Sequence, residues 1–287
     1  MARAGGGNDG DRAVYDVIAV RYGTRSTTRS DIFLHYSLYG EPDADARMDY
    51  YFWVLRRQQT AILVDCGFNA GSGGRRGRTM LVTPANALRK LGIGPADVSL
   101  LIATHGHYDH IGNLDEFTAA EVVMSEREYD FWTGPLASRP LFATSAEAAD
   151  IDALRSLNAT GRLRLLRQSH GQLPTEVAPG VQVIEVGGHT PGQLIVTAEI
   201  AGGTAVIASD ALHYYEEMRL DRPFTHVADL PAMYTGFELL RSLSMDGSHY
   251  LVAGHDPEVM QRFSPVEGTQ LDGTALAVRI GPPAGAG

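Results

Sequence analysis

The chain is short of cysteine, of long apolar runs and of positive charge, and each shortage excludes a class of protein. Cys66 is the only cysteine, so no internal disulfide can form, which fits a reducing compartment and a buried, inert thiol. No run of about 18 consecutive apolar residues offers a spanning helix. The opening residues also lack the apolar stretch of a secretory signal. We therefore expect a cytoplasmic protein with no membrane partner.

Acidic side chains outnumber basic ones by 34 to 24, which gives a formal net charge of -10. This balance repels nucleic-acid backbones, so we expect no nucleic-acid partner. Apolar residues make up 44% of the chain, which is enough to build a core. Glycine-rich ends predict flexible tails at residues 1–13 and 281–287, around a single folded domain at residues 14–280.

Apolar periodicity predicts an alternation of strands and helices within that domain. The expected strands cover residues 15–23, 49–67, 98–104, 121–125, 181–188, 193–210 and 249–256, with hairpin turns at 57–59 and 202–203. The expected helices cover residues 83–92, 145–157 and 230–243. Two halves of strands followed by helices favour an α/β fold of the αββα sandwich type, with two mixed β-sheets flanked by helices.

The segment "THGHYDHIG" at residues 104–112 follows an apolar run directly and carries four ligand-type side chains, His105, His107, Asp109 and His110. Neutral imidazole nitrogens and carboxylate oxygens suit a divalent ion such as zinc. A short turn after a strand can point His105 and His107 to one side and the other pair to another. The spacing therefore predicts a site for two metal ions.

Three further ligand-type residues stand behind later apolar runs, namely His189, Asp210 and His255. A lone histidine is more often a core or surface residue with satisfied hydrogen bonds than a ligand. Four separate strand ends that carry ligand-type residues in this order reverse that expectation.

The segments "THGHYDHIG", "GGHTPGQ", "ASD" and "AGHD" together resemble the metallo-β-lactamase superfamily of hydrolases. The resemblance implies the αββα sandwich as one catalytic domain and two divalent metal ions as cofactors, Zn²⁺ first, with Fe, Mn or Co as alternatives. It further implies that Asp65 in "LVDCG" supports the ligands from behind. By this resemblance His105, His107 and His189 hold the first ion, Asp109, His110 and His255 the second, and Asp210 bridges them.

Within the superfamily the chain is most similar to N-acyl-homoserine lactonases and to glyoxalase II. The long segment before the second strand and the insert in mid-chain favour the lactonases, whereas residues 256–287 lack the basic character expected of glyoxalase II. Two departures stand out. His213, followed by Tyr214, occupies the place where such lactonases usually carry a tyrosine, and Gln193 replaces a second histidine of the "HTPGH" pattern.

The function that the resemblance implies is opening of a lactone ring, with N-acyl-homoserine lactones (quorum quenching) as the first substrate class. Two metal ions lower the pKa of a bridging water from about 15.7 towards about 7, which yields a hydroxide nucleophile. Asp109 would accept the proton, and Tyr214 or His213 would donate a hydrogen bond to the oxyanion. Alternatives are hydrolysis of another cyclic ester, an amide or a thioester at the same site, and a di-iron redox reaction.

Two further expectations concern surfaces. Homodimerisation is plausible from the resemblance, with residues 21–31 as a contact arm. The arginines of "GGRRGR" at residues 73–78 could meet an anionic substrate, but a solvated surface loop is the preferred interpretation.

Overall fold

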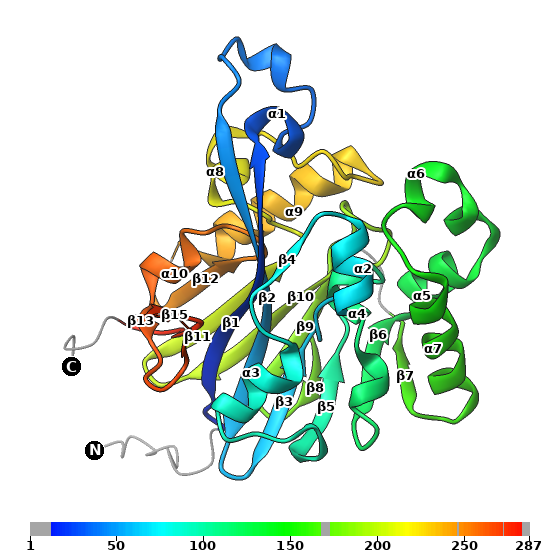
Figure 1. The fold of residues 1–287 in the computed structure, drawn as a ribbon, viewed down its shortest axis with the longest axis vertical. Coiled ribbons are helices and arrows are strands. Elements are labelled where there is room, and N and C mark those ends of the chain that lie inside the picture. The colour runs from blue at the N-terminus through cyan, green and yellow to red at the C-terminus, as the bar shows by residue number, and fades with distance from the viewer. Residues whose placement is uncertain (1–12, 168–172, 246, 272, 283–287) are drawn as a thin grey trace, which may run out of the picture.

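The computed structural model describes residues 13–167, 173–245, 247–271 and 273–282, and within them two β-sheets stack face to face (Figure 1). The predicted αββα sandwich is confirmed. The predicted tails lie almost wholly outside the described residues. The first sheet runs, in spatial order, through β13 (Ser264–Pro265), β16 (Ala277–Arg279), β1 (Asp16–Thr28), β2 (Asp45–Arg57), β3 (Thr60–Val64), β5 (Val98–Ile102), β6 (Glu121–Ser125) and β7 (Leu163–Leu166), with β4 (Thr79–Met80) paired to β1.

The second sheet is smaller and follows the second half of the chain. Its hairpin between β10 and β11 turns at Gly202, as the sequence predicts. In spatial order it contains β12 (His249–Ala253), β11 (Gly203–Ser209), β10 (Leu194–Ile200), β9 (Val181–Glu185) and β8 (Thr175–Ala178), and a separate small hairpin pairs β14 (Gln270–Leu271) with β15 (Thr274–Ala275).

Helices cover the outer faces of the two sheets, and short ones build the loops. The longer helices are α3 (Pro84–Lys90), α5 (Glu126–Thr133), α7 (Ala148–Ala159) and α9 (Leu230–Leu243). The shorter ones are α1 (Arg29–Ile32), α2 (Ala70–Arg75), α4 (Tyr108–Ile111), α6 (Pro140–Ala143), α8 (Tyr215–Leu220) and α10 (Val259–Arg262), with 3₁₀ turns η1 (Tyr36–Tyr39), η2 (Pro95–Asp97), η3 (Leu114–Glu116) and η4 (Pro135–Ser138). In the part of the chain so described, no helix is both long and apolar enough to cross a membrane.

Strand β2 shows why a strand of the first sheet has a continuous run of apolar residues and not an alternation of apolar and polar ones. Tyr51 and Trp53 point into the core between the sheets, whereas Phe52 and Val54 point into the core beneath the outer helices. A strand that is buried on both faces needs apolar side chains at every position. On the other side of the molecule, α9 packs on the second sheet, and its Phe237 belongs to the same cluster of buried apolar residues as the strands of that sheet.

Two boundaries differ from the predicted ones. The helix expected at residues 145–157 begins at Ala148, because Glu147 has an extended backbone and takes the N-cap position. The expected contact arm at residues 21–31 is largely strand, since β1 pairs with β2 up to Thr28 and the loop between the two strands begins after it. The far ends of β1 and β2 project with α1 beyond the body of the sandwich (Figure 1).

Strand directions explain how residues distant in the sequence can meet. Strands β3 and β5 run parallel, as do β11 and β12. Strand β9 runs in the same direction as β11, because both are antiparallel to β10. The carboxyl ends of β3 and β5 therefore lie at one edge of the first sheet, and those of β9, β11 and β12 lie at one edge of the second.

Candidate metal centre

Each predicted ligand follows the carboxyl end of a strand at one of these two edges. His105 and His107 follow β5, and Asp109 and His110 form the next turn as part of α4. The others follow β9, β11 and β12, in that order: His189, Asp210 and His255.

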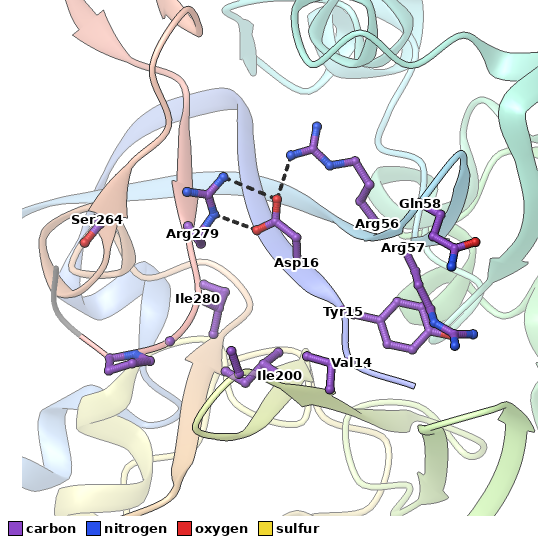
Figure 2. Close-up of a pocket in the computed structure, with 13 residues that line it drawn as sticks. Val14, Tyr15, Asp16, Arg56, Arg57, Gln58, Ile200, Ser264, Arg279 and Ile280 are labelled. Carbon is purple, nitrogen blue, oxygen red and sulfur yellow. Dashed lines mark hydrogen bonds and ion pairs between the residues drawn. The ribbon is translucent and has the colours of Figure 1, made fainter. Parts of the chain in front are cut away.

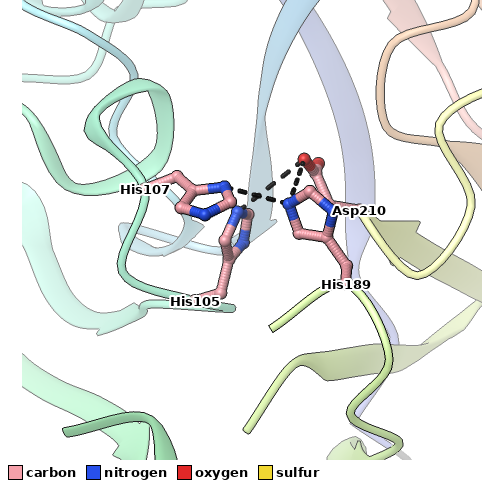
Figure 3. Close-up of side chains that lie close together, drawn as sticks. All are labelled: His105, His107, His189 and Asp210. Carbon is pink, nitrogen blue, oxygen red and sulfur yellow. Dashed lines mark hydrogen bonds and ion pairs between the residues drawn. The ribbon is translucent and has the colours of Figure 1, made fainter. Parts of the chain in front are cut away.

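The structure brings all seven predicted ligands together in two adjacent buried clusters, each of which could hold a metal ion. The ligand atoms within each cluster lie within 4.8 Å of one another. Figure 3 shows the first cluster, in which three imidazoles and one carboxylate converge from the loops after β5, β9 and β11. The first cluster contains His105, His107, His189 and Asp210, and the second contains Asp109, His110 and His255.

The carboxylate of Asp210 lies between the two clusters. Its Oδ2 atom is 3.2 Å from Nε2 of His189 and 3.7 Å from Nε2 of His105. Its Oδ1 atom is 3.2 Å from Nε2 of His110 and 3.1 Å from Nε2 of His255. One oxygen thus faces each cluster, which is the arrangement that a bridging carboxylate requires.

The three histidines of the first cluster are suited to act as neutral ligands. Burial lowers the pKa of His105, His107 and His189 well below its ordinary value, so these imidazoles keep a free lone pair. His189 and His255 each have Nδ1 within 2.8 Å of a backbone carbonyl, those of His226 and Asp49. Donation from Nδ1 leaves Nε2 unprotonated and aimed at the cluster.

Several polar atoms at the centre are buried and have no hydrogen-bond partner among the described residues, although buried polar groups in native proteins are nearly always satisfied. They are the Nε2 atoms of His105, His110, His213 and His255 and the Oδ1 atom of Asp210. Divalent ions would satisfy these atoms, and imidazole nitrogens with carboxylate oxygens are the donor set of zinc sites. The residues present therefore fit two divalent metal ions.

Asp65 supports the centre from behind, as the resemblance implies. It is fully buried, and its Oδ2 atom lies 2.7 Å from Nδ1 of His110. It also accepts hydrogen bonds from the backbone N–H and the hydroxyl of Thr104 and from the hydroxyl of Ser209. Asp65 and Ser209 both have positive φ, 61° and 46°. Such backbone strain, here at the ends of β3 and β11, is typical of a functional site.

Glu128 on α5 joins the two ligand loops, and sequence reasoning missed it. Its carboxylate accepts hydrogen bonds from the backbone N–H groups of Gly106 and Gly192, at 2.9 and 2.8 Å, and from the indole of Trp132. A Cβ atom at Gly106 would lie 2.2 Å from the Trp132 ring, so only glycine fits there. No local pattern marks a glutamate as the partner of loops that lie far away in the sequence.

His213 and Tyr214 occupy different surroundings. Nε2 of His213 lies 3.1 Å from Asp210, its Nδ1 lies 3.3 Å from Glu217, and its ring stacks on Phe224. Although burial opposes it, the charges of Asp210 and Glu217 raise the pKa of His213 to about 9. The hydroxyl of Tyr214 donates to the backbone carbonyl of Arg47 instead.

Gln193, which departs from the expected pattern, and Cys66, which was expected to be inert, both make structural contacts. The side-chain amide of Gln193 donates to the carbonyl of Leu194, so Gln193 stays outside both clusters. Cys66 is buried, its thiol faces the carbonyl of His110, and burial raises its pKa well above the ordinary value.

A small cavity of about 60 Å³ opens onto the metal centre. It is lined by the ligand-type residues His107, Asp109, His189 and Asp210, by Arg25 and Arg78, and by Met48, Tyr50, Tyr108, Ser145, Phe224 and His226. The expectation of a solvated loop at "GGRRGR" is therefore only partly right. Arg75 and Arg76 pair with Glu147 away from the cavity, but Arg78 lines it.

A larger cavity of about 740 Å³ lies at the opposite edge of the first sheet, between the start of β1 and the end of β2 (Figure 2). Its two central guanidiniums, Arg56 and Arg279, both bind Asp16, at 2.7 and 2.6 Å. Its size alone does not make it the active site, because it contains no cluster of ligand-type side chains.

Comparison with known proteins places the chain among relatives of matching chemistry. An N-acyl homoserine lactonase from Bacillus sp is 26% identical over 175 residues, 60% of this chain and 62% of the lactonase. Metallo-beta-lactamase domain-containing protein 1 from Homo sapiens is 33% identical over 152 residues, 52% of this chain and 42% of that protein. The matched part of the chain thus spans less than two thirds of either relative.

Solved structures share the fold over most of the chain. A crystal structure of a quorum-quenching N-acyl homoserine lactone lactonase aligns with a TM-score of 0.71 at 22% identity, and covers 86% of this chain and 95% of its own. A hydrolase of the beta lactamase superfamily aligns with a TM-score of 0.67 at 19% identity, and covers 95% of this chain and 98% of its own. The sequence matches the Metallo-beta-lactamase superfamily over residues 48–255, a segment that contains all seven clustered ligands. The chain belongs to the metallo-beta-lactamase superfamily.

Proposed function

We propose that the chain is a metal-dependent hydrolase that opens a lactone ring at a pair of divalent metal ions. The observation that carries this proposal is the carboxylate of Asp210, whose two oxygens each face a different cluster of ligand-type side chains. Membership of the superfamily and similarity to N-acyl homoserine lactonases support it.

In this proposal the two clusters hold one ion each, Zn²⁺ by preference, and Asp210 is shared between them. When bound, the ions would act as Lewis acids and lower the pKa of a bound water towards neutrality. Asp65 and Glu128 hold the ligand loops in place through their hydrogen bonds to His110, Gly106 and Gly192.

Asp109 is the proposed acceptor of the proton, because its carboxylate both belongs to the second cluster and lines the cavity. One water is consumed in the reaction. Its oxygen bonds to the carbonyl carbon, the ring C–O bond breaks, and the proton held by Asp109 passes to the leaving ring oxygen. The product is a single hydroxy acid, and no covalent intermediate with the protein is needed.

The two candidates for a hydrogen bond to the oxyanion, Tyr214 and His213, both have other partners in the structure. Tyr214 has already given its hydroxyl hydrogen to Arg47. His213 lies between the carboxylates of Asp210 and Glu217, and we assign it the role of positioning residue for Asp210. A direct contact of either residue with the substrate stays a prediction.

The test is hydrolysis of a panel by the zinc- or cobalt-loaded protein: homoserine lactones of differing chain length, an aliphatic γ-lactone, a thioester and a cephalosporin. We expect proton release with lactones, and its loss in the Asp210→Ala variant. The matched control is Asp152→Ala, since Asp152 is exposed on α7, distant from both clusters. Turnover of the thioester or the cephalosporin alone would contradict the lactonase assignment.

A further inference from the structure

Two guanidiniums lie on the wall of the metal-site cavity and come from separate parts of the fold. Arg25 belongs to β1, and Arg78 lies between α2 and β4. Both side chains are partly buried. Neither belongs to the metal clusters, so the proposed hydrolysis alone gives them no role.

The carboxylates of Asp109 and Asp210 line the same cavity, but neither of them pairs directly with these guanidiniums. Among the described residues, Arg25 and Arg78 form no ion pair, and Nε of Arg25 is buried without a hydrogen-bond partner. Arg78 donates only to uncharged groups, the hydroxyl of Tyr108 at 3.1 Å and the carbonyl of Arg76 at 2.6 Å. A partly buried cation without a counter-charge is costly unless a ligand supplies the negative charge.

The neighbouring arginines Arg75 and Arg76 show that the lack of a carboxylate partner is specific to the arginine that lines the cavity. Arg75 and Arg76 both bind the carboxylate of Glu147, at 2.8 Å for Arg75. The chain therefore neutralises two arginines of this loop with its own carboxylate and leaves the third facing the metal centre.

The two guanidiniums also act on a common neighbour. The guanidinium of Arg78 lies 6.0 Å from the centre of the Tyr50 ring, and Tyr50 lines the same cavity. Burial raises the pKa of Tyr50 well above its ordinary value, and the charges of Arg78 and Arg25 both oppose that rise. Because the cavity is small, a group bound by these arginines lies next to the clustered ligands.

We infer that the site takes small lactones that carry an oxyanion, a carboxylate or a phosphoryl group, beside the ring, and that Arg25 and Arg78 bind that oxyanion. This inference rests on the proposed function, since it names the substrate class of the same site. Planar guanidiniums match the geometry of carboxylate and phosphate oxygens. An uncharged N-acyl substituent offers them only an amide carbonyl and leaves their charge uncompensated.

The experiment compares three γ-butyrolactones that share one ring: the γ-carboxylate, its methyl ester and the γ-phosphonate. We measure kcat/KM with the zinc-loaded protein and, separately, binding of the ring-opened carboxylate product by calorimetry, with and without zinc. We expect the carboxylate or the phosphonate to exceed the methyl ester by about tenfold or more. The anion with the higher kcat/KM shows whether the site binds a carboxylate or a phosphoryl group.

Variants assign the preference to the two arginines. In Arg25→Gln and Arg78→Gln we expect the ratio of anionic to ester kcat/KM to fall about tenfold. Arg75→Gln is the matched control, because it removes an arginine of the same loop that does not line the cavity, and its ratio should equal that of the wild type.

The outcomes separate this inference from the lactonase proposal. Equal turnover of the ester and both anions, unaffected by Arg25→Gln and Arg78→Gln, would overturn the inference and leave the lactonase proposal standing. No turnover of any ring, together with product binding that weakens in both variants, would support the oxyanion site and contradict the lactonase.

Discussion

Asp65 determines which nitrogen of His110 faces the centre, although Asp65 does not belong to either cluster itself. Replacing it with asparagine keeps the shape and tolerates the positive φ of 61°, but it removes the charged acceptor for Nδ1 of His110. We expect zinc affinity to fall about 10- to 100-fold. Competition with a chelating dye measures this loss, and Asp152→Asn, at an exposed position of α7, serves as the control. Equal zinc affinity of Asp65→Asn and the wild type would contradict this role of Asp65.

Asp150, in the first turn of α7, gives a pH dependence that is separate from the metal centre. Burial, followed by the charges of Glu147 and Asp115, raises its pKa from 3.8 to about 7. The folded state therefore binds a proton that the unfolded state has released above about pH 4. The stabilisation is complete below the unfolded pKa and is lost as the pH rises through about 7.

The variant Asp150→Asn should remove this dependence. We expect its free energy of unfolding to exceed that of the wild type by about 1 kcal/mol at pH 8, and the difference to shrink towards pH 5. Chemical denaturation of both proteins in the same buffers measures it, and the pH dependence of the metal centre cancels in the difference. A difference independent of pH would mean that Asp150 titrates normally.

At the scale of elements, helix α5 connects two loops that carry ligands from different sheets. The carboxylate of Glu128 accepts hydrogen bonds from three N–H groups through its two oxygens. In Glu128→Gln one oxygen becomes an NH2 group, which cannot accept, so at least one buried N–H group loses its partner. We expect a loss of about 2–3 kcal/mol in the free energy of unfolding. Glu126→Gln on the same helix breaks only a surface ion pair with Arg167 and should cost about 0.5 kcal/mol or less. Similar losses in the two variants would refute this role for α5.

Strands and long helices were predictable from the sequence because their signals are local. The hairpin between β2 and β3 has its turn where polar residues interrupt two apolar runs, and α9 extends from Leu230 to Leu243 as its periodicity predicts. Helix α5 was not predicted. Its sequence mixes charged and aromatic residues, and what holds it is the tertiary contact of Glu128 and Trp132 with the ligand loops.

At the scale of the whole molecule, the candidate ligands could be found because each follows a strand, and strands that share a direction end at one edge of a sheet. Glu128 and Arg25 could not be found in this way, because they meet the centre through contacts between distant segments. The sequence offered Arg78 only as one of three arginines in "GGRRGR", and could not tell which of them lines the cavity. His213 shows the same limit. Its identity suggested a contact with substrate, whereas its place between Asp210 and Glu217 depends on the packing of Phe224 over its ring. Homodimerisation stays a prediction, which light scattering can test.

The central claim is that two metal ions act together at the shared carboxylate of Asp210. The most direct measurement is the initial rate of lactone opening as zinc is added stepwise to metal-free protein. The account predicts that activity rises to a plateau at two equivalents per chain, and that Asp210→Ala stays inactive throughout. A plateau at one equivalent, or an Asp210→Ala variant that reaches the wild-type rate, would contradict it.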